Sequence, residues 1–151
     1  MSAKSLRQSP VAWSFVWLLI VLGVVARLAP LANQDGRLLS QWPTEDGYYM
    51  LTISRELGLG NGMSTADGSM VTNGVQPLAT LLWALPYALL DGDKTASIAA
   101  VLLLEFIFAC LSAWMLYRLA LRLLPASAGR DPRWLPALAT GLWFASAPHI
   151  A

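Results

Sequence analysis

The sequence has few charged residues. Only 13% of its 151 residues are charged, about half of the roughly 25% that a soluble domain carries. Hydrophobic residues make up 56%, and the mean hydropathy is +0.54. The charges are also segregated, because long apolar stretches have none while the acids cluster in one segment. This pattern indicates that a lipid bilayer, and not water, surrounds most of the chain.

Cysteine and basic residues are scarce as well. Cys110 is the only cysteine, so no disulfide can form within the chain, and we expect it to be a small packing residue. The net charge of +1 leaves no basic stripe for a nucleic acid. Glycine-rich nucleotide loops and a Ser-His-Asp pattern are absent, so the sequence does not support nucleotide use or serine hydrolysis.

The apolar stretches predict an all-α membrane protein with about four transmembrane or partly spanning helices, because about 20 apolar residues cross a bilayer core. The expected helices cover residues 11–32, 78–90, 95–124 and 134–151, after a cytoplasmic N-terminus at 1–10. Val24-Val25-Ala26 also resembles a signal-peptide cleavage site, but the length of the first stretch favours a membrane anchor. Nothing polar follows the last stretch, so we expect the polypeptide to continue beyond Ala151.

Two charge patterns give conflicting topologies. Lys4 and Arg7 favour a cytoplasmic N-terminus, which places residues 33–77 outside the cytoplasm. Segment 118–133 has four arginines against one aspartate, a balance of +3, and it also lies outside if 78–90 crosses completely. Either 78–90 does not cross completely, or spans further along the chain overrule the local preference.

The first extracytoplasmic loop, 33–77, is acidic and rich in glycine. It holds five acids against two arginines, a balance of −3, and seven glycines. Within it, Thr44 is a good N-cap and the next two residues are acidic, which favours a helix over about 44–58. Tyr49, Met50 and Ile53 repeat at helical spacing. We therefore expect a juxtamembrane amphipathic helix that lies along the membrane interface.

Two groups of polar residues in this loop are candidates for chemistry. Glu45 and Asp46 are adjacent carboxylates, and either one can act as a general base or orient a nucleophile. Their other interpretation is stabilisation of the helix N-terminus. Asn73 and Gln76 offer donors and acceptors to sugar hydroxyls or phosphate oxygens, or they belong to an ordinary turn before the next helix.

Glu105 is a third candidate, because it is the only charge within a long apolar stretch. An ionisable group at membrane depth raises a functional question. Glu105 can pair with Arg27, pair with a helix further along the chain, or belong to a proton path. Structural pairing is the favoured interpretation.

The order of the motifs resembles bacterial members of the GT-C membrane glycosyltransferases, similar to protein O-mannosyltransferases and aminoarabinose transferases of lipid A. The matching pieces are Glu45-Asp46-Gly47-Tyr48-Tyr49, Ile53-Ser54-Arg55-Glu56-Leu57 and Thr72-Asn73-Gly74-x-Gln76-Pro77-Leu78. The resemblance covers about residues 11 to 150, the N-terminal part of such an enzyme. It implies transfer of a sugar from a polyprenyl-phosphate donor to a glycan, lipid or protein acceptor outside the membrane.

The resemblance also implies roles for individual residues. Asp46 matches the general base, whereas the acid that follows it in the mannosyltransferase pattern falls on Gly47, and Glu45 supplies an acid one position earlier. The implied catalytic residues are Asp46 and Glu45, and the implied substrate-binding residues are Tyr49, Arg55, Asn73 and Gln76. Arg27 is a second candidate for holding the donor phosphate.

No cofactor is expected, because a polyprenyl phosphate is already an activated leaving group. Some relatives use a divalent metal, but Glu45 and Asp46 alone are too few ligands for one. The implied location is a bacterial plasma membrane, with several spans and a periplasmic or extracellular first loop. Two other hypotheses remain: a small non-enzymatic membrane protein or assembly partner that docks through the acidic loop, and part of a transporter that uses Glu105.

Overall fold

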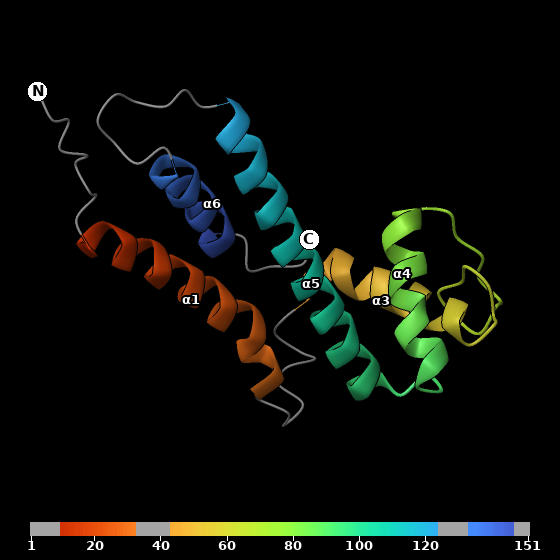
Figure 1. The fold of residues 1–151 in the computed structure, drawn as a ribbon. Helices are drawn as coiled ribbons and strands as arrows, with labels where there is room; N and C mark the ends of the chain where they lie inside the picture. The colour runs from red at the N-terminus through yellow and green to blue at the C-terminus, as the bar shows by residue number, and fades with distance from the viewer. Residues whose placement is uncertain (1–9, 33–42, 124–132, 147–151) are drawn as a thin grey trace, which may run out of the picture. The chain divides into compact units, whose positions relative to one another are not determined.

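The structure, a computed structural model, describes residues 10–32, 43–123 and 133–146. Secondary structure in this part of the chain is helical (Figure 1). The helices are α1 (Pro10–Ala32), α3 (Glu45–Gly58), α4 (Pro77–Leu89), α5 (Lys94–Leu123) and α6 (Trp134–Ser146). The described residues include no strand beyond an isolated β-bridge between Ser64 and Val71. The expected all-helical fold is confirmed for these residues.

Two of these helices are long and apolar enough to cross a membrane. They are the segments Trp13–Ala32 and Lys94–Leu123, judged by length and composition. In contrast, α4 and α6 have 13 residues each, or roughly 20 Å at 1.5 Å per residue. The fourth expected stretch ends at 151, and residues 147–151 lie outside the described part.

The chain divides into two compact units, and the division falls within α1 and α5. The first unit contains α1 up to Leu28, α5 from Phe106 onward, and α6. The second contains α3, α4 and the part of α5 that ends at Glu105. Each unit has its own packing.

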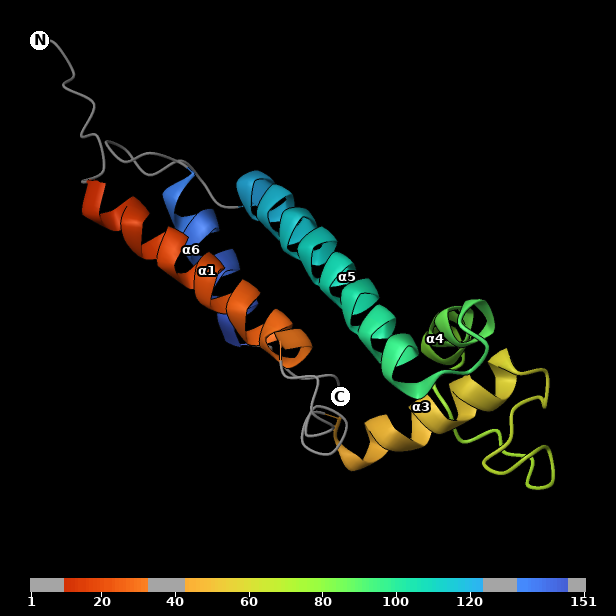
Figure 2. The same ribbon diagram turned by 90° about the horizontal axis from the view of Figure 1, so that it is seen from below.

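In the first unit, α1 and α6 lie side by side (Figures 1 and 2). Arg27 of α1 is only 8% exposed, and its guanidinium lies 4.3 Å from the centre of the Phe144 ring of α6. The same group donates hydrogen bonds to the carbonyls of Gly23, at 3.2 Å, and Phe144. Carbonyls in the last turn of a helix have no partner within that helix. Arg27 therefore satisfies the end of α6.

Two glycines at this helix contact have different surroundings. A Cβ at Gly23 would lie 2.8 Å from Phe144 Cε1 and 2.9 Å from the Phe144 carbonyl oxygen. A Cβ at Gly141 would lie 3.5 Å from Leu19 Cβ, an ordinary contact. Only Gly23 is required for the close approach of α6 to α1.

We therefore expect alanine to have opposite effects at these two positions. Gly23→Ala should lower the free energy of unfolding by about 1–3 kcal/mol, because the added methyl overpacks the contact. Gly141→Ala should raise it by roughly 0.5–1 kcal/mol, since alanine is the better helix former and has room here. Thermal unfolding of the purified chain in detergent, followed by circular dichroism, measures both. Equal effects of the same sign would contradict this packing.

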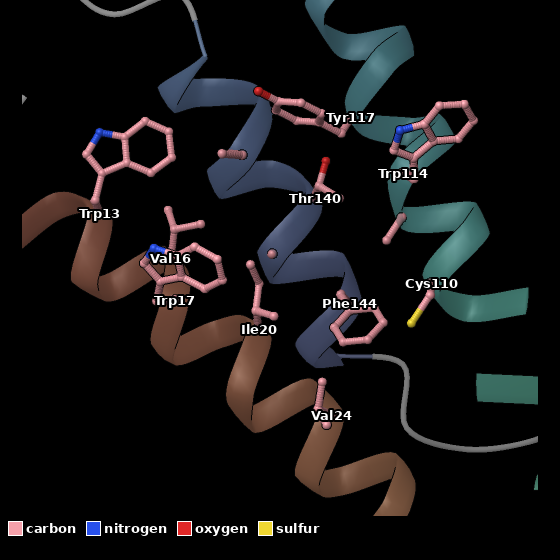
Figure 3. A pocket seen from close by; sticks show the side chains of 13 residues that line it. Trp13, Val16, Trp17, Ile20, Val24, Cys110, Trp114, Tyr117, Thr140 and Phe144 are labelled. Atoms are coloured by element: carbon pink, nitrogen blue, oxygen red, sulfur yellow. The ribbon is translucent and has the colours of Figure 1, made fainter. Parts of the chain in front are cut away.

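The helices of the first unit have defined directions (Figure 3). Trp13 of α1 and Tyr117 of α5 lie toward one end, whereas Val24 and Cys110 lie toward the other. As a result α1 and α5 run antiparallel. Within α6, Thr140 lies on the Tyr117 side and Phe144 on the Cys110 side, so α6 runs parallel to α1. The start of α1, the end of α5 and the start of α6 therefore lie at one end of this unit.

The second unit is built around the crossing of α3 and α4 (Figure 1). Its core cluster is formed by Met50, Leu51, Trp83, Tyr87, Ile98, Val101 and Leu102. The crossing is close because Gly58 has no side chain. A Cβ there would lie 2.7 Å from the Ala84 carbonyl oxygen and 2.8 Å from Tyr87 Cβ.

Glu105 belongs to this second unit and accepts a hydrogen bond from Trp83 Nε1 at 2.7 Å. The bond links α5 to the buried face of α4, since Trp83 is in the core cluster. Glu105 therefore has a structural partner, as favoured from sequence, but that partner is an indole and not Arg27. A proton path through Glu105 gains no support from this arrangement.

Helix α4 is apolar on two faces. Thr80, Trp83, Ala84 and Tyr87 are buried in the second unit. Leu78, Leu81, Leu85 and Leu89 are exposed, with accessibilities from 55% to 82%. An apolar outer face of this kind is typical of a helix that contacts lipid or another protein.

Candidate functional site

The first turn of α3 carries the two candidate carboxylates. Thr44 is its N-cap, and its hydroxyl accepts a hydrogen bond from the Gly47 amide at 3.1 Å. Thr44 therefore makes the N-cap hydrogen bond, while the two acids lie in the first turn, where they also interact favourably with the helix dipole. Both Glu45 and Asp46 are exposed. Among the described residues, no hydrogen bond or ion pair engages either carboxylate, so both are accessible to another molecule.

Tyr49 connects this helix to the second polar group. Its hydroxyl is 2.7 Å from the Thr72 hydroxyl, and Thr72 in turn accepts a hydrogen bond from the Gly74 amide at 3.3 Å. Tyr49 follows Asp46 by three residues and Glu45 by four, which places all three on one side of α3. The structure thus brings the turn that contains Asn73 beside the acidic end of the helix.

Asn73 and Gln76 lie at the entry to α4, and both are exposed. Gln76 is the N-cap residue, and its carbonyl accepts a hydrogen bond from the Thr80 amide at 3.0 Å. Its side chain makes no capping hydrogen bond. The side-chain amide of Gln76 is therefore not used in capping α4. The residue still has a structural role, because its backbone forms the turn that begins the helix.

Arg55 lies away from this group. It follows Asp46 by nine residues, or roughly 14 Å along the helix axis. Its Nε donates to the Gly92 carbonyl and its Nη1 to Glu56 Oε1, both at 3.1 Å. The bond to Gly92 holds the end of α3 to the segment after α4. A phosphate-binding role for Arg55 stays a prediction, and the structure does not bring this residue to the carboxylates.

Sequence reasoning missed the role of Glu56. It counted Glu56 among the charges of an acidic loop, but the side chain is only 5% exposed. Besides the bond from Arg55, Glu56 Oε2 accepts a hydrogen bond from Asn61 Nδ2 at 2.6 Å. A buried charge requires such partners. Arg55, directly before Glu56 in the sequence, was the signal that this carboxylate could be paired.

A short hairpin before α4 was also missed. Asp67 and Gly68 have φ values of 46° and 78°, and the Ser69 amide donates to the Ala66 carbonyl at 2.7 Å. Asp-Gly at the two central positions with positive φ is the signal of a tight hairpin turn. The Thr72 amide then bonds the Met63 carbonyl at 2.9 Å. The hairpin therefore sets the position of the residue that Tyr49 contacts.

No known protein family, characterised protein or solved structure matches the chain. In the part of the chain that the structure describes, no group of three or more His, Cys, Asp or Glu side chains can hold a metal ion. Two carboxylates and a tyrosine hydroxyl in α3, together with the side-chain amides of the turn that Tyr49 contacts, can accept and orient hydroxyl groups.

Proposed function

We propose that the chain is part of an integral membrane glycosyltransferase of the GT-C type. In this proposal a sugar passes from a polyprenyl phosphate to a hydroxyl acceptor outside the cytoplasm, with Asp46 as the general base. The observation that carries the proposal is the hydrogen bond between Tyr49 and Thr72. It brings together two motifs that the family resemblance contains and that are more than 20 residues apart in the sequence.

Membrane placement is supported by the exposed surfaces of α1 and α5. The core helix of a soluble protein is mostly buried, whereas only 22% of each apolar window is buried here. Exposed side chains include Trp17, Leu18 and Val21 on α1, and Ile107 and Leu111 on α5. Exposed apolar side chains along two long apolar helices favour lipid as the surrounding medium. A signal sequence would account for α1 alone and not for α5.

The proposed reaction needs few protein groups. The acceptor hydroxyl donates a hydrogen bond to the Asp46 carboxylate, and its oxygen attacks the anomeric carbon of the sugar. The bond from that carbon to the phosphate oxygen breaks, polyprenyl phosphate leaves, and the acceptor proton passes to Asp46. Because attack and departure occur on opposite faces, the anomeric configuration inverts. The carboxylate contributes orientation of the nucleophile as well as proton acceptance.

Asn73 and Gln76 fit a supporting role in this reaction. Their side-chain amides can donate to phosphate oxygens and exchange hydrogen bonds with sugar hydroxyls. The contact of Tyr49 with Thr72 holds the Asn73 turn at the acidic end of α3. Neutral hydrogen-bond donors together with a carboxylate suit a substrate that has hydroxyl groups and a phosphate.

Removal of one hydroxyl tests this arrangement. Tyr49→Phe deletes the bond to Thr72, and we expect sugar transfer to fall about threefold to tenfold, because a hydrogen bond contributes about 0.5–1.5 kcal/mol. Tyr48→Phe is the matched control, because it removes a neighbouring exposed phenol that has no such bond. Transfer from a radiolabelled polyprenyl-phosphate sugar in membranes containing the full-length chain measures both. Equal rates for the two variants would separate the Tyr49 contact from function.

A further inference from the structure

The first unit contains an apolar groove that sugar transfer does not use. It has a volume of about 480 Å³ and is walled by α1, α5 and α6 (Figure 3). Its lining includes the aromatic side chains of Trp13, Trp17, Trp114, Tyr117 and Phe144. Volumes of this size hold organic ligands. A lining with so few polar groups does not hold ordered water.

One end of the groove is next to two basic side chains. Trp114 walls the groove and also borders a second hollow lined by Arg118 and Arg122. The Arg118 guanidinium lies 5.7 Å from the centre of the Trp114 ring. Arg118 and Arg122 are four residues apart, so they share one face of α5. The apolar groove and the two arginines therefore adjoin the same side chain, Trp114.

The charge of these arginines is not balanced by the described protein residues. Both are exposed, and the only ion pair among those residues joins Arg55 and Glu56. Glu105, the one acid in α5, lies 13 residues before Arg118, or roughly 20 Å along the helix. Arginine binds phosphate through paired N–H donors while its face remains free to stack on an aromatic ring.

We propose that this site binds one anionic phospholipid, with an acyl chain in the groove and the phosphate at Arg118 and Arg122. An aromatic side chain at the membrane surface, followed by arginines, is the arrangement expected where a lipid headgroup meets its chain. The groove lies between helices whose outer surfaces are apolar, so a lipid chain can enter it from the bilayer. The inference depends on the membrane placement of α1 and α5 and not on sugar transfer.

Lipid retention tests the proposal. The full-length chain is purified in detergent, mixed with phosphatidylglycerol or phosphatidylcholine of identical acyl chains, and examined by native mass spectrometry. We expect one phosphatidylglycerol to be retained at least tenfold better than phosphatidylcholine. The Arg118→Gln/Arg122→Gln variant should reduce that preference to about twofold. Lys94→Gln, which removes one charge at the other end of α5, should keep the wild-type preference.

A second pair of variants tests the acyl-chain part of the site. Ala113 lines the groove, so Ala113→Phe should fill it and reduce retention of both lipids. Leu111→Phe adds a ring to an exposed position outside the groove and should have no effect. Equal retention of both lipids by the wild type, no lipid at all, or an unchanged preference in the arginine variant would overturn the proposal. Recovery of the chain in the soluble fraction would overturn the membrane placement on which it depends.

Discussion

Asp46→Asn is expected to lower sugar transfer by about 10²–10⁴-fold, the contribution typical of a general base. The amide has nearly the shape of the carboxylate but cannot accept the proton of the acceptor hydroxyl. Thr44 provides the helix cap, and Asp46 is exposed and makes no hydrogen bond within the described residues. The fold should therefore tolerate the change, and the amount of protein in the membrane should stay the same. Transfer rate and membrane level are measured together.

The matched control for this change is Asp67→Asn. It removes a carboxylate from the same loop, and asparagine accepts the positive φ of 46° at this position as readily as aspartate. Transfer by this variant should equal that of the wild type. If Asp46→Asn keeps full activity, Asp46 is not the base. In that case a large loss in Glu45→Gln would assign the base to Glu45, the acid one position before the residue that matches the base of the family.

Comparison of the wild type with Asp46→Asn also separates catalysis from docking. In the non-enzymatic alternative, the exposed acids bind a basic partner and the chain transfers no sugar. Absence of transfer by the wild type, together with loss of a co-purifying partner in Asp46→Asn, would favour that alternative. Transfer that depends on both the polyprenyl-phosphate sugar and Asp46 would exclude it.

Local features of the fold could be predicted because they depend on neighbouring residues. Thr44 and the two acids after it predict the start of α3, and the structure begins this helix at Glu45. Long apolar runs in the same way predict helices, and each such run within the described residues forms a helix. The resemblance placed the acidic group and the Asn73 group in one site, but only the contact of Tyr49 with Thr72 brings them together in space.

Contacts between distant segments could not be predicted from sequence. Arg27 bonds the carbonyl of Phe144, 117 residues away, and the sequence does not indicate which helix end a buried arginine meets. Glu105 similarly has a tryptophan as its partner, because an indole N–H satisfies a carboxylate without a second charge. A pattern of charges in the sequence suggests ion pairs, whereas the packing of the helices decides which hydrogen-bond donor lies beside a given carboxylate or carbonyl.

Topology was left open by the sequence, and we propose one solution from the directions of the helices in the first unit. The start of α1 and the end of α5 lie at the same end of the first unit. If both helices cross the membrane, Arg118 and Arg122 lie on the side of the N-terminus, in agreement with the positive-inside tendency. This requires that α4 does not cross. Its 13 residues span roughly 20 Å, short of the roughly 30 Å hydrocarbon core.

Single cysteines on each side of α5 are therefore expected to react from opposite sides of the membrane. In a Cys110→Ser background, Ser69→Cys lies in the exposed hairpin turn and Leu123→Cys at the end of α5. A membrane-impermeant maleimide added to intact cells should label Ser69→Cys, and it should label Leu123→Cys only after permeabilisation. In intact cells, therefore, Ser69→Cys should be labelled and Leu123→Cys should not be labelled at all. Labelling of both from outside would mean that α4 crosses completely, since one additional crossing brings residue 123 to the side of the acidic loop.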